Sequence, residues 1–166
     1  MGKAGSHCIP NPVRVIGDYA FAGCYGLASV TIPRGVTNIG YWAFAWCRDL
    51  ERVYFAGDAP TANVYTFEEA RRATIYYLPG SSGWRSSYWG RPTVLWNPRC
   101  QAQRIADGVF CFTVIGTANI PVAIETSADL VTWTRLSATN LVNGALTFQD
   151  PGPHDLGRRF YRIASW

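Results

Sequence analysis

Apolar residues recur at a fixed spacing through the first half of the chain. The stretch IGDYAFAGCYGL at residues 16–27 returns as IGYWAFAWCRDL at residues 39–50. The retained letters are Ile, Gly, Ala, Phe, Cys and Leu, each displaced by 23 residues, while the positions between them differ. A repeat of this length is typical of a solenoid in which each coil contributes one strand. The pattern therefore predicts stacked coils in which the retained side chains point inward and the others face solvent.

The same spacing predicts which residues lie above one another. One coil has no interior of its own, so it buries apolar side chains only against its neighbours, and like residues form columns. A second displacement by 23 gives a weaker third copy, so the first half is expected to hold about three coils joined by short helical turns. Gly17 and Gly40 are expected to adopt a turn conformation that a Cβ would resist. The predicted columns are Phe21/Phe44/Phe67, Leu27/Leu50/Ala73, Val30/Val53/Tyr76 and Ile32/Phe55/Leu78.

The consensus of these coils, IGxxAFxxCxxLxxVxIPxxVxxIG, resembles the BspA-type leucine-rich repeat of secreted and surface proteins in bacteria and some protists. The resemblance covers residues 9–98, and residues 73–98 are similar to the segment that closes such arrays. It implies a secreted or cell-surface protein whose solenoid serves in protein binding or adhesion. Residues 1–8 are expected to be a linker that precedes the fold.

Short β-branched and aromatic runs separated by turn residues occupy residues 99–166. In residues 121–127, Val122, Ile124 and Thr126 alternate with smaller or polar residues, which is the period of a half-buried strand. Such runs predict a small antiparallel β-sandwich. The set ETSADLVTW, FQD and RRFYRI also resembles a C-terminal module of secreted proteins from the Verrucomicrobia and related bacteria. The predicted fold class is therefore mainly β, a short leucine-rich-repeat solenoid followed by this module.

Composition and charge exclude some classes of partner. The chain has 166 residues, of which 48% are hydrophobic, and a formal net charge of +4. Its basic residues form no run longer than a pair, which argues against a nucleic-acid-binding face. No apolar stretch approaches the roughly 18 residues that a membrane-spanning helix needs. The first ten residues also lack the apolar segment of a signal peptide.

The five cysteines contain no CxxC pair, so neither a metal site nor a complete disulfide framework is expected. Cys24 and Cys47 share one column, in which the third coil has Ala70. A small, slightly polar residue is tolerated there, which favours buried free thiols over a disulfide between stacked coils. Cys100 and Cys111 are a second candidate pair, across a local strand connection.

Catalytic chemistry is not indicated by the titratable residues. The chain has only two histidines, and His154 lies in the loop DPGPHDLG beside Asp150 and Asp155. No Ser or Cys occurs in a nucleophile elbow that could complete a triad. Residues flanked by Pro and Gly in this way are usually solvated turn formers. We therefore expect no enzyme activity, no catalytic residues and no cofactor.

The outward side of the predicted solenoid strands supplies the first set of candidate binding residues. Strand residues alternate in direction, so the neighbours of the inward columns are predicted to face solvent. These outward rows are Ser29/Arg52/Ile75 and Thr31/Tyr54/Tyr77. Tyr and Arg are enriched at the energetic centres of protein interfaces. Thr31, Arg52, Tyr54 and Tyr77 are therefore the predicted contacts of a protein ligand.

Aromatic residues on the turn side of the coils supply the second set. Tyr19, Trp42 and Tyr65 follow one another at the same spacing, and Trp46 replaces Gly23 of the preceding coil. Because flat rings can stack on sugars, Trp42 and Trp46 are candidates for carbohydrate binding. A structural alternative is that these rings cover the core or pack on the second half. A further alternative is that copies of the chain associate through an uncovered strand edge at the start of the solenoid.

Overall fold

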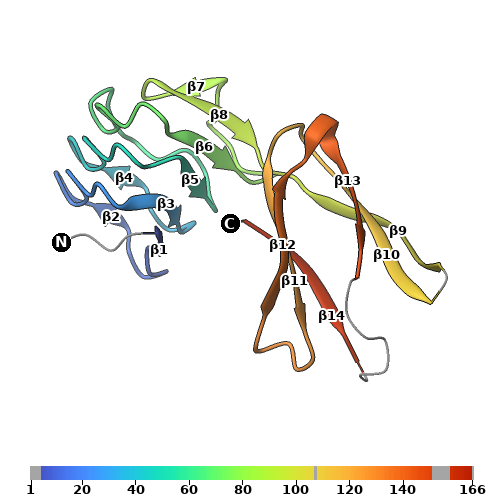
Figure 1. The fold of residues 1–166 in the computed structure, drawn as a ribbon. Coiled ribbons are helices and arrows are strands. Elements are labelled where there is room, and N and C mark those ends of the chain that lie inside the picture. The colour runs from blue at the N-terminus through green and yellow to red at the C-terminus, as the bar shows by residue number, and fades with distance from the viewer. Residues whose placement is uncertain (1–4, 107, 151–157, 166) are drawn as a thin grey trace. The chain divides into compact units, whose positions relative to one another are not determined.

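A computed structural model of the chain describes residues 5–106, 108–150 and 158–165 (Figure 1). The chain divides into two compact units, Met1–Leu95 and Trp96–Trp166. The division falls close to the domain boundary predicted between residues 98 and 99. Each unit is built of strands, and the one helical element of the described residues is a 3-10 turn at Val142–Gly144.

The first unit is a solenoid with a six-stranded sheet in the order β1-β3-β5-β6-β8-β7. Its strands are β1 (Gly5–Cys8), β3 (Leu27–Ile32), β5 (Arg52–Phe55), β6 (Thr74–Tyr77), β7 (Ser87–Tyr88) and β8 (Arg91–Leu95). Neighbours are parallel, except that β7 and β8 form an antiparallel pair. A second, two-stranded parallel sheet joins β2 (Val15–Ile16) and β4 (Asn38–Ile39). The predicted mainly β solenoid of about three coils is confirmed. The expected short helical turns are wrong, because the described residues of this unit contain turns but no helix.

The turns between β2 and β3, and their counterparts in later coils, also stack on one another. Within a coil they are closed by short-range bonds, such as Ala22 N–H to the Tyr19 carbonyl at 3.0 Å. Between coils, Phe21 N–H donates to the Ala43 carbonyl at 2.7 Å, and Phe44 N–H to the Thr66 carbonyl at 2.9 Å. Because these backbone groups are paired between coils, the turn side is as regular as the sheet side.

The predicted phenylalanine column forms the centre of the solenoid core. The rings of Phe21 and Phe44 lie 5.0 Å apart with an interplanar angle of 4°, and those of Phe44 and Phe67 lie 5.3 Å apart at 7°. Phe44 and Phe67 are fully buried. Each large apolar side chain buried in this way contributes roughly 1.5–3 kcal/mol to stability. In the second coil the retained apolar letters are therefore all core residues, namely Ile39, Ala43, Phe44, Cys47 and Leu50.

The third coil is one residue shorter than a constant spacing of 23 requires. Leu50 and Ala73 are both buried at that spacing, but the register then pairs Val53 with the fully buried Ile75. The prediction of Tyr76 in this column is therefore wrong, as is that of an outward Ile75. One residue fewer connects the turn to β6, and a slip of one residue moves every later strand side chain to the opposite face.

Gly40 is retained because two coils approach each other closely, not because of its backbone angles. Neither Gly17 nor Gly40 is among the residues with positive φ, so the predicted turn conformation is wrong. A Cβ on Gly40 would lie 2.5 Å from the backbone nitrogen of Asp18 in the preceding coil. No real Cβ tolerates that distance, so the coil spacing requires glycine at this position.

Residues 5–8 belong to the solenoid, so the predicted linker is wrong for them. They form β1, which pairs in parallel with β3, and Ser29 Oγ donates a hydrogen bond to Ser6 Oγ at 2.7 Å. The sequence GSHC has none of the β-branched or aromatic residues that indicate a strand. Backbone pairing with β3, rather than local preference, therefore holds this segment extended.

Aromatic side chains close the last coil. Trp84 lies against Phe55 with ring centroids 4.9 Å apart, and Trp89 lies against Phe67 at 6.0 Å. Trp89 is only 8% exposed. Trp89 lies in the turn between β7 and β8, and its ring covers the end of the phenylalanine column. This segment lies within residues 73–98, where the resemblance implied a closing cap.

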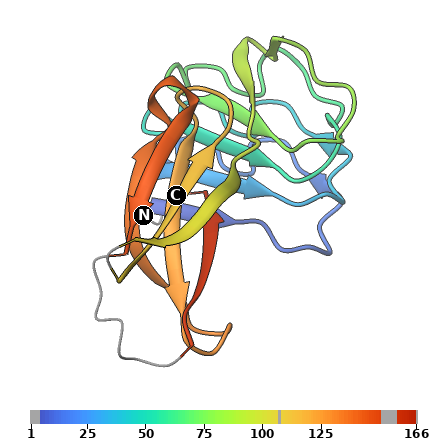
Figure 2. The same ribbon diagram turned by 90° about the vertical axis from the view of Figure 1, so that its right-hand side faces the viewer.

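The second unit contains two three-stranded antiparallel sheets, in the orders β13-β10-β9 and β12-β11-β14 (Figure 2). Its strands are β9 (Arg99–Ala106), β10 (Val109–Ile115), β11 (Pro121–Ser127), β12 (Thr134–Asn140), β13 (Ala145–Gln149) and β14 (Phe160–Ala164). The two sheets meet where Tyr161 contacts Phe110 and Phe112, with ring centroids 4.9 and 5.9 Å apart. The antiparallel strands agree with the predicted pattern.

All five cysteines are free thiols in the structure. Cys47 is buried, and its Sγ donates a hydrogen bond to the Phe21 carbonyl at 3.0 Å. Burial raises the pKa of this thiol to about 11. The register of β9 and β10 places Cys100 opposite Val114, not opposite Cys111, so the candidate disulfide between these two cysteines is not formed.

Candidate binding surface on the solenoid

The outward row of the solenoid sheet differs from the predicted one in its third member. Thr31 and Tyr54 are neighbours across β3 and β5, as predicted, but Tyr76 follows them on β6. The rings of Tyr54 and Tyr76 are stacked with centroids 5.1 Å apart. Tyr77 pairs with Phe55 instead, so its predicted place beside Tyr54 is wrong. The one-residue slip in the third coil is the cause.

Several residues that were predicted to face solvent on this side of the sheet are largely buried. Tyr54 is 8% and Ser29 5% exposed, and the Arg52 side chain, which pairs with Glu51 at 3.7 Å, is 17% exposed. The prediction of a solvent-exposed face is therefore wrong at these positions. Stacking on Tyr76 covers one face of the Tyr54 ring.

A second column of rings lies on the turn side of the coils. Tyr19 and Trp42 stack with centroids 5.4 Å apart at 13°, and Trp42 and Tyr65 stack at 5.5 Å and 25°. We call these three residues the aromatic ladder. Trp42 Nε1 also donates a hydrogen bond to Glu68 Oε2 at 2.5 Å. The predicted column on this side is therefore a continuous stack of rings.

Unlike the phenylalanine column, the ladder is open to solvent. Tyr19 is 55% and Tyr65 47% exposed. The residues that precede Trp42 and Tyr65 in the chain, Tyr41 and Val64, are 51% and 69% exposed. We call these five residues the ladder surface. Contiguous exposed apolar groups of this kind mark interaction sites on soluble proteins.

Aromatic residues at this edge of the solenoid have backbone angles that favour glycine. The φ angles are 57° at Tyr19, 53° at Trp42 and 58° at Trp46, and Gly23, the counterpart of Trp46 in the preceding coil, has 69°. A residue with a Cβ pays roughly 1 kcal/mol or more to hold this left-handed conformation. Glycine would avoid that cost. The aromatic side chains are therefore present in spite of the backbone, not because of it.

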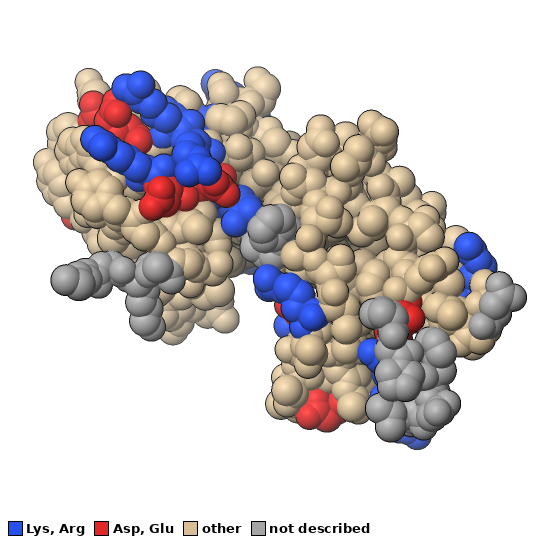
Figure 3. Space-filling model, in the orientation of Figure 1, with Lys and Arg blue, Asp and Glu red and all other residues tan. Residues whose placement is uncertain are grey.

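Several charged side chains of the solenoid form ion pairs within the molecule. Arg71 pairs with Glu69 at 2.7 Å, and Arg72 pairs with Glu51. The hydrogen bond from Arg71 lowers the pKa of Glu69. Figure 3 shows Lys and Arg side by side with Asp and Glu on the solenoid, rather than a patch of one sign. Such a mixed surface does not have the basic face typical of nucleic-acid binding.

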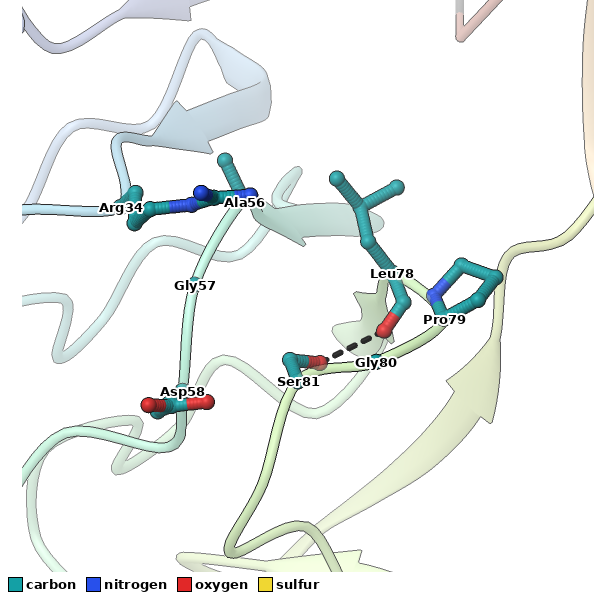
Figure 4. A pocket seen from close by; sticks show the side chains of 8 residues that line it. All are labelled: Arg34, Ala56, Gly57, Asp58, Leu78, Pro79, Gly80 and Ser81. Carbon is teal, nitrogen blue, oxygen red and sulfur yellow. Dashed lines mark hydrogen bonds between the residues drawn. The ribbon is translucent and has the colours of Figure 1, made fainter.

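A small open pocket of about 260 Å³ lies where the chain leaves β5 and β6 (Figure 4). Its titratable lining residues are Arg34 and Asp58. Hydrogen bonds from Ser82, together with the attraction of Arg34, lower the pKa of Asp58. Ser81 Oγ donates to the Leu78 carbonyl at 2.6 Å. The Ser81 hydroxyl is thus bonded to a backbone carbonyl and not to Asp58, so these two residues do not form a nucleophile–base pair here.

Of the three residues considered for catalysis, the structure describes Asp150. His154 and Asp155 lie outside the described residues. Asp150 is buried, accepts a hydrogen bond from Tyr161 Oη at 2.6 Å and pairs with Arg159 at 3.0 Å. Burial, and then this contact with Asp150, raises the pKa of Tyr161 to about 12. Asp150 therefore holds the end of β13 to β14.

The described residues contain no cluster of three or more His, Cys, Asp or Glu side chains that could hold a metal ion. In the same part of the chain, no helix is long and apolar enough to cross a membrane.

The stacked parallel strands and hydrogen-bonded turns of the first unit form a β-solenoid. Residues 4–83 match the family model described as "BspA type Leucine rich repeat region (6 copies)". Repeats of this type are commonly protein-interaction or adhesion modules and typically have no enzymatic activity. No curated protein and no solved structure matches the chain. Because the family match ends before the second unit, the likeness of that unit to the Verrucomicrobia module stays a prediction.

Proposed function

We propose that the solenoid is a non-enzymatic module of a secreted or surface protein, and that it binds a protein partner through the ladder surface. One observation carries this proposal. Tyr19 and Trp42 have a backbone conformation that glycine would adopt at lower cost, and Tyr19 remains 55% exposed. Strained residues that persist on a surface are characteristic of functional sites.

The geometry of the ladder favours a protein over a carbohydrate. With ring centroids 5.4 and 5.5 Å apart, the two faces of Trp42 are covered by Tyr19 and Tyr65. A sugar that stacks on a ring needs a free face, whereas the ladder offers edges and hydroxyl groups. Edges of Tyr and Trp beside an aliphatic group such as Val64 are typical of protein interfaces.

The sheet face is the weaker candidate for the same function. Of the residues predicted there, Tyr54 is buried and Arg52 retains little exposure, while Tyr77 lies in a different row. Arg and Tyr contribute to binding when a partner can bury them, and here they are already partly buried. Association of copies through the edge of β1 remains a prediction.

Selection from a random peptide library displayed on phage, against the intact chain, tests the proposal. Peptides that bind the ladder surface are expected to lose about 30-fold or more in affinity for Trp42→Ala, the loss typical of a central aromatic contact. Val142→Ala is the matched control, because Val142 is 63% exposed on the second unit. Circular dichroism shows whether each variant is folded. Selected peptides that bind Trp42→Ala as tightly as the intact chain would contradict the proposal.

A further inference from the structure

We infer that the partner segment is an amphipathic α-helix with basic residues beside its apolar stripe, lying along the aromatic ladder. The inference rests on the proposed function and specifies the chemistry of its partner. Two independent features carry it, the spacing of the rings and the charges at the border of the ladder.

The ring spacing matches the repeat of a helix. Successive ladder rings lie 5.4 and 5.5 Å apart. An α-helix advances about 5.4 Å per turn, so its side chains at i, i+3 or i+4, and i+7 reach successive rings in step. Side chains on one face of a strand are roughly 6.7 Å apart, which leaves a strand about 2.5 Å out of register after two steps. A polyproline helix advances roughly 9 Å per turn, which matches neither one ring step nor two.

The charges at the border of the ladder are negative, although the chain as a whole is positive. Asp18 is exposed and is fixed beside the ladder by the hydrogen bond that Tyr41 N–H donates to its Oδ1 at 2.7 Å. Glu68 is held there by the bond from Trp42 Nε1. The next carboxylate, Glu69, is paired with Arg71. Asp18 and Glu68 therefore attract Lys or Arg on the flanks of the incoming helix.

Synthetic peptides test the helix directly. The first probe is a Leu-, Ala- and Lys-containing helix of about 18 residues with leucines on one face and lysines beside them. The second has the same composition, with the leucines distributed around the helix. The third has leucine and lysine in a proline-rich sequence. We expect the first to bind the intact chain at least tenfold more tightly than the other two, by isothermal titration calorimetry.

Two variants separate the effect of the ring spacing from that of the charge. Asp18→Asn together with Glu68→Gln is expected to weaken the first peptide and to reduce the dependence of its affinity on salt. Trp42→Ala is expected to remove the preference for the peptide with its leucines on one face. Val142→Ala is expected to change neither this preference nor the salt dependence of the affinity. Equal affinity for the first two peptides, or a higher affinity for the proline-rich one, would contradict the inference that the partner segment is a helix.

The two proposals fail in different ways. If library-selected peptides lose affinity for Trp42→Ala but prefer extended or proline-rich conformations, the helix is wrong and the binding surface stands. If the selected peptides bind Trp42→Ala as tightly as the intact chain, the proposed binding surface is wrong, and so is the proposed helical partner.

Discussion

Two columns of aromatic rings run through the same three coils, one inside the solenoid and one outside. Phe21, Phe44 and Phe67 stack with centroids 5.0 and 5.3 Å apart, and the aromatic ladder stacks at 5.4 and 5.5 Å. In sequence both columns follow the same spacing. They differ in their exposure to solvent, because Phe44 and Phe67 are fully buried whereas Tyr19 and Tyr65 are about half exposed.

The difference shows that repetition in a solenoid has two separate causes. The inner column recurs because each coil must bury its apolar side chain against the next. The ladder gains little from burial, and Tyr19 and Trp42 hold a backbone conformation that costs free energy. Core stability accounts for the first column, and we attribute the second to the proposed binding function. Three predictions test this division.

The largest expected effect is the loss of a buried ring. Phe44→Ala removes a fully buried side chain between two stacked neighbours and leaves a cavity. We expect it to lower the free energy of unfolding by about 3–5 kcal/mol, measured by urea unfolding. The matched ladder variant, Tyr65→Ala, should cost about 1 kcal/mol or less, because its side chain is 47% exposed. Equal losses for the two variants would remove the distinction between the columns.

The sequence alone predicted the inner column, because burial between coils preserves residue type at a constant spacing. It did not predict the one-residue slip at Ile75. The turn is one residue shorter, and because Ile75, Tyr76 and Tyr77 are all apolar or aromatic, either alternate set of β6 side chains could face the core. It missed β1 because GSHC has no strand preference of its own. In β6, polar Thr74 is followed by apolar Ile75, and this was the feature of the sequence that could have shown that Ile75 faces the core.

The binding surface was predicted less well than the core. Alternation along a strand tells which side chains leave the core, but not whether neighbouring strands cover them, so Tyr54 was placed on an exposed face. The ladder was found as a column because Tyr19, Trp42 and Tyr65 keep the spacing. The left-handed backbone at Trp46 has one signal in the sequence, namely the glycine at position 23 of the preceding coil.

The second expected effect is an alkaline loss of stability that depends on a buried thiol. Cys47 is buried, whereas its neighbour Trp46 is 36% exposed, so consecutive residues face opposite sides of the coil. Burial raises the pKa of Cys47 from 9.0 to about 11. The folded state therefore favours the neutral thiol. This contribution is fully present below pH 9 and is lost as the pH rises to about 11.

Two pH units correspond to about 2–3 kcal/mol, which the intact chain should lose between pH 8 and pH 11 in excess of Cys47→Ala. Alanine is the matched replacement, because Ala70 occupies the same place in the third coil and is fully buried. Urea unfolding at several pH values measures the difference. Parallel pH profiles for the two proteins would show that the thiol is not protected from solvent.

The smallest expected effect is also the sharpest test of the outer surface. Trp46→Gly relieves the left-handed backbone at φ 58°, as Gly23 already does at φ 69° one coil earlier. We expect a gain of about 0.5–1 kcal/mol in the free energy of unfolding. Gly23→Ala is the reciprocal variant and should cost a similar amount, because a Cβ is introduced at the same backbone conformation. Because Trp46 shares the strained conformation of Tyr19 and Trp42, we also expect Trp46→Gly to weaken the binding of peptides selected against the intact chain. A stabilised protein with reduced binding is the combination expected of a residue kept for function. A destabilised Trp46→Gly protein would instead assign the indole to packing, because its contacts would then outweigh the strain that it imposes on the turn.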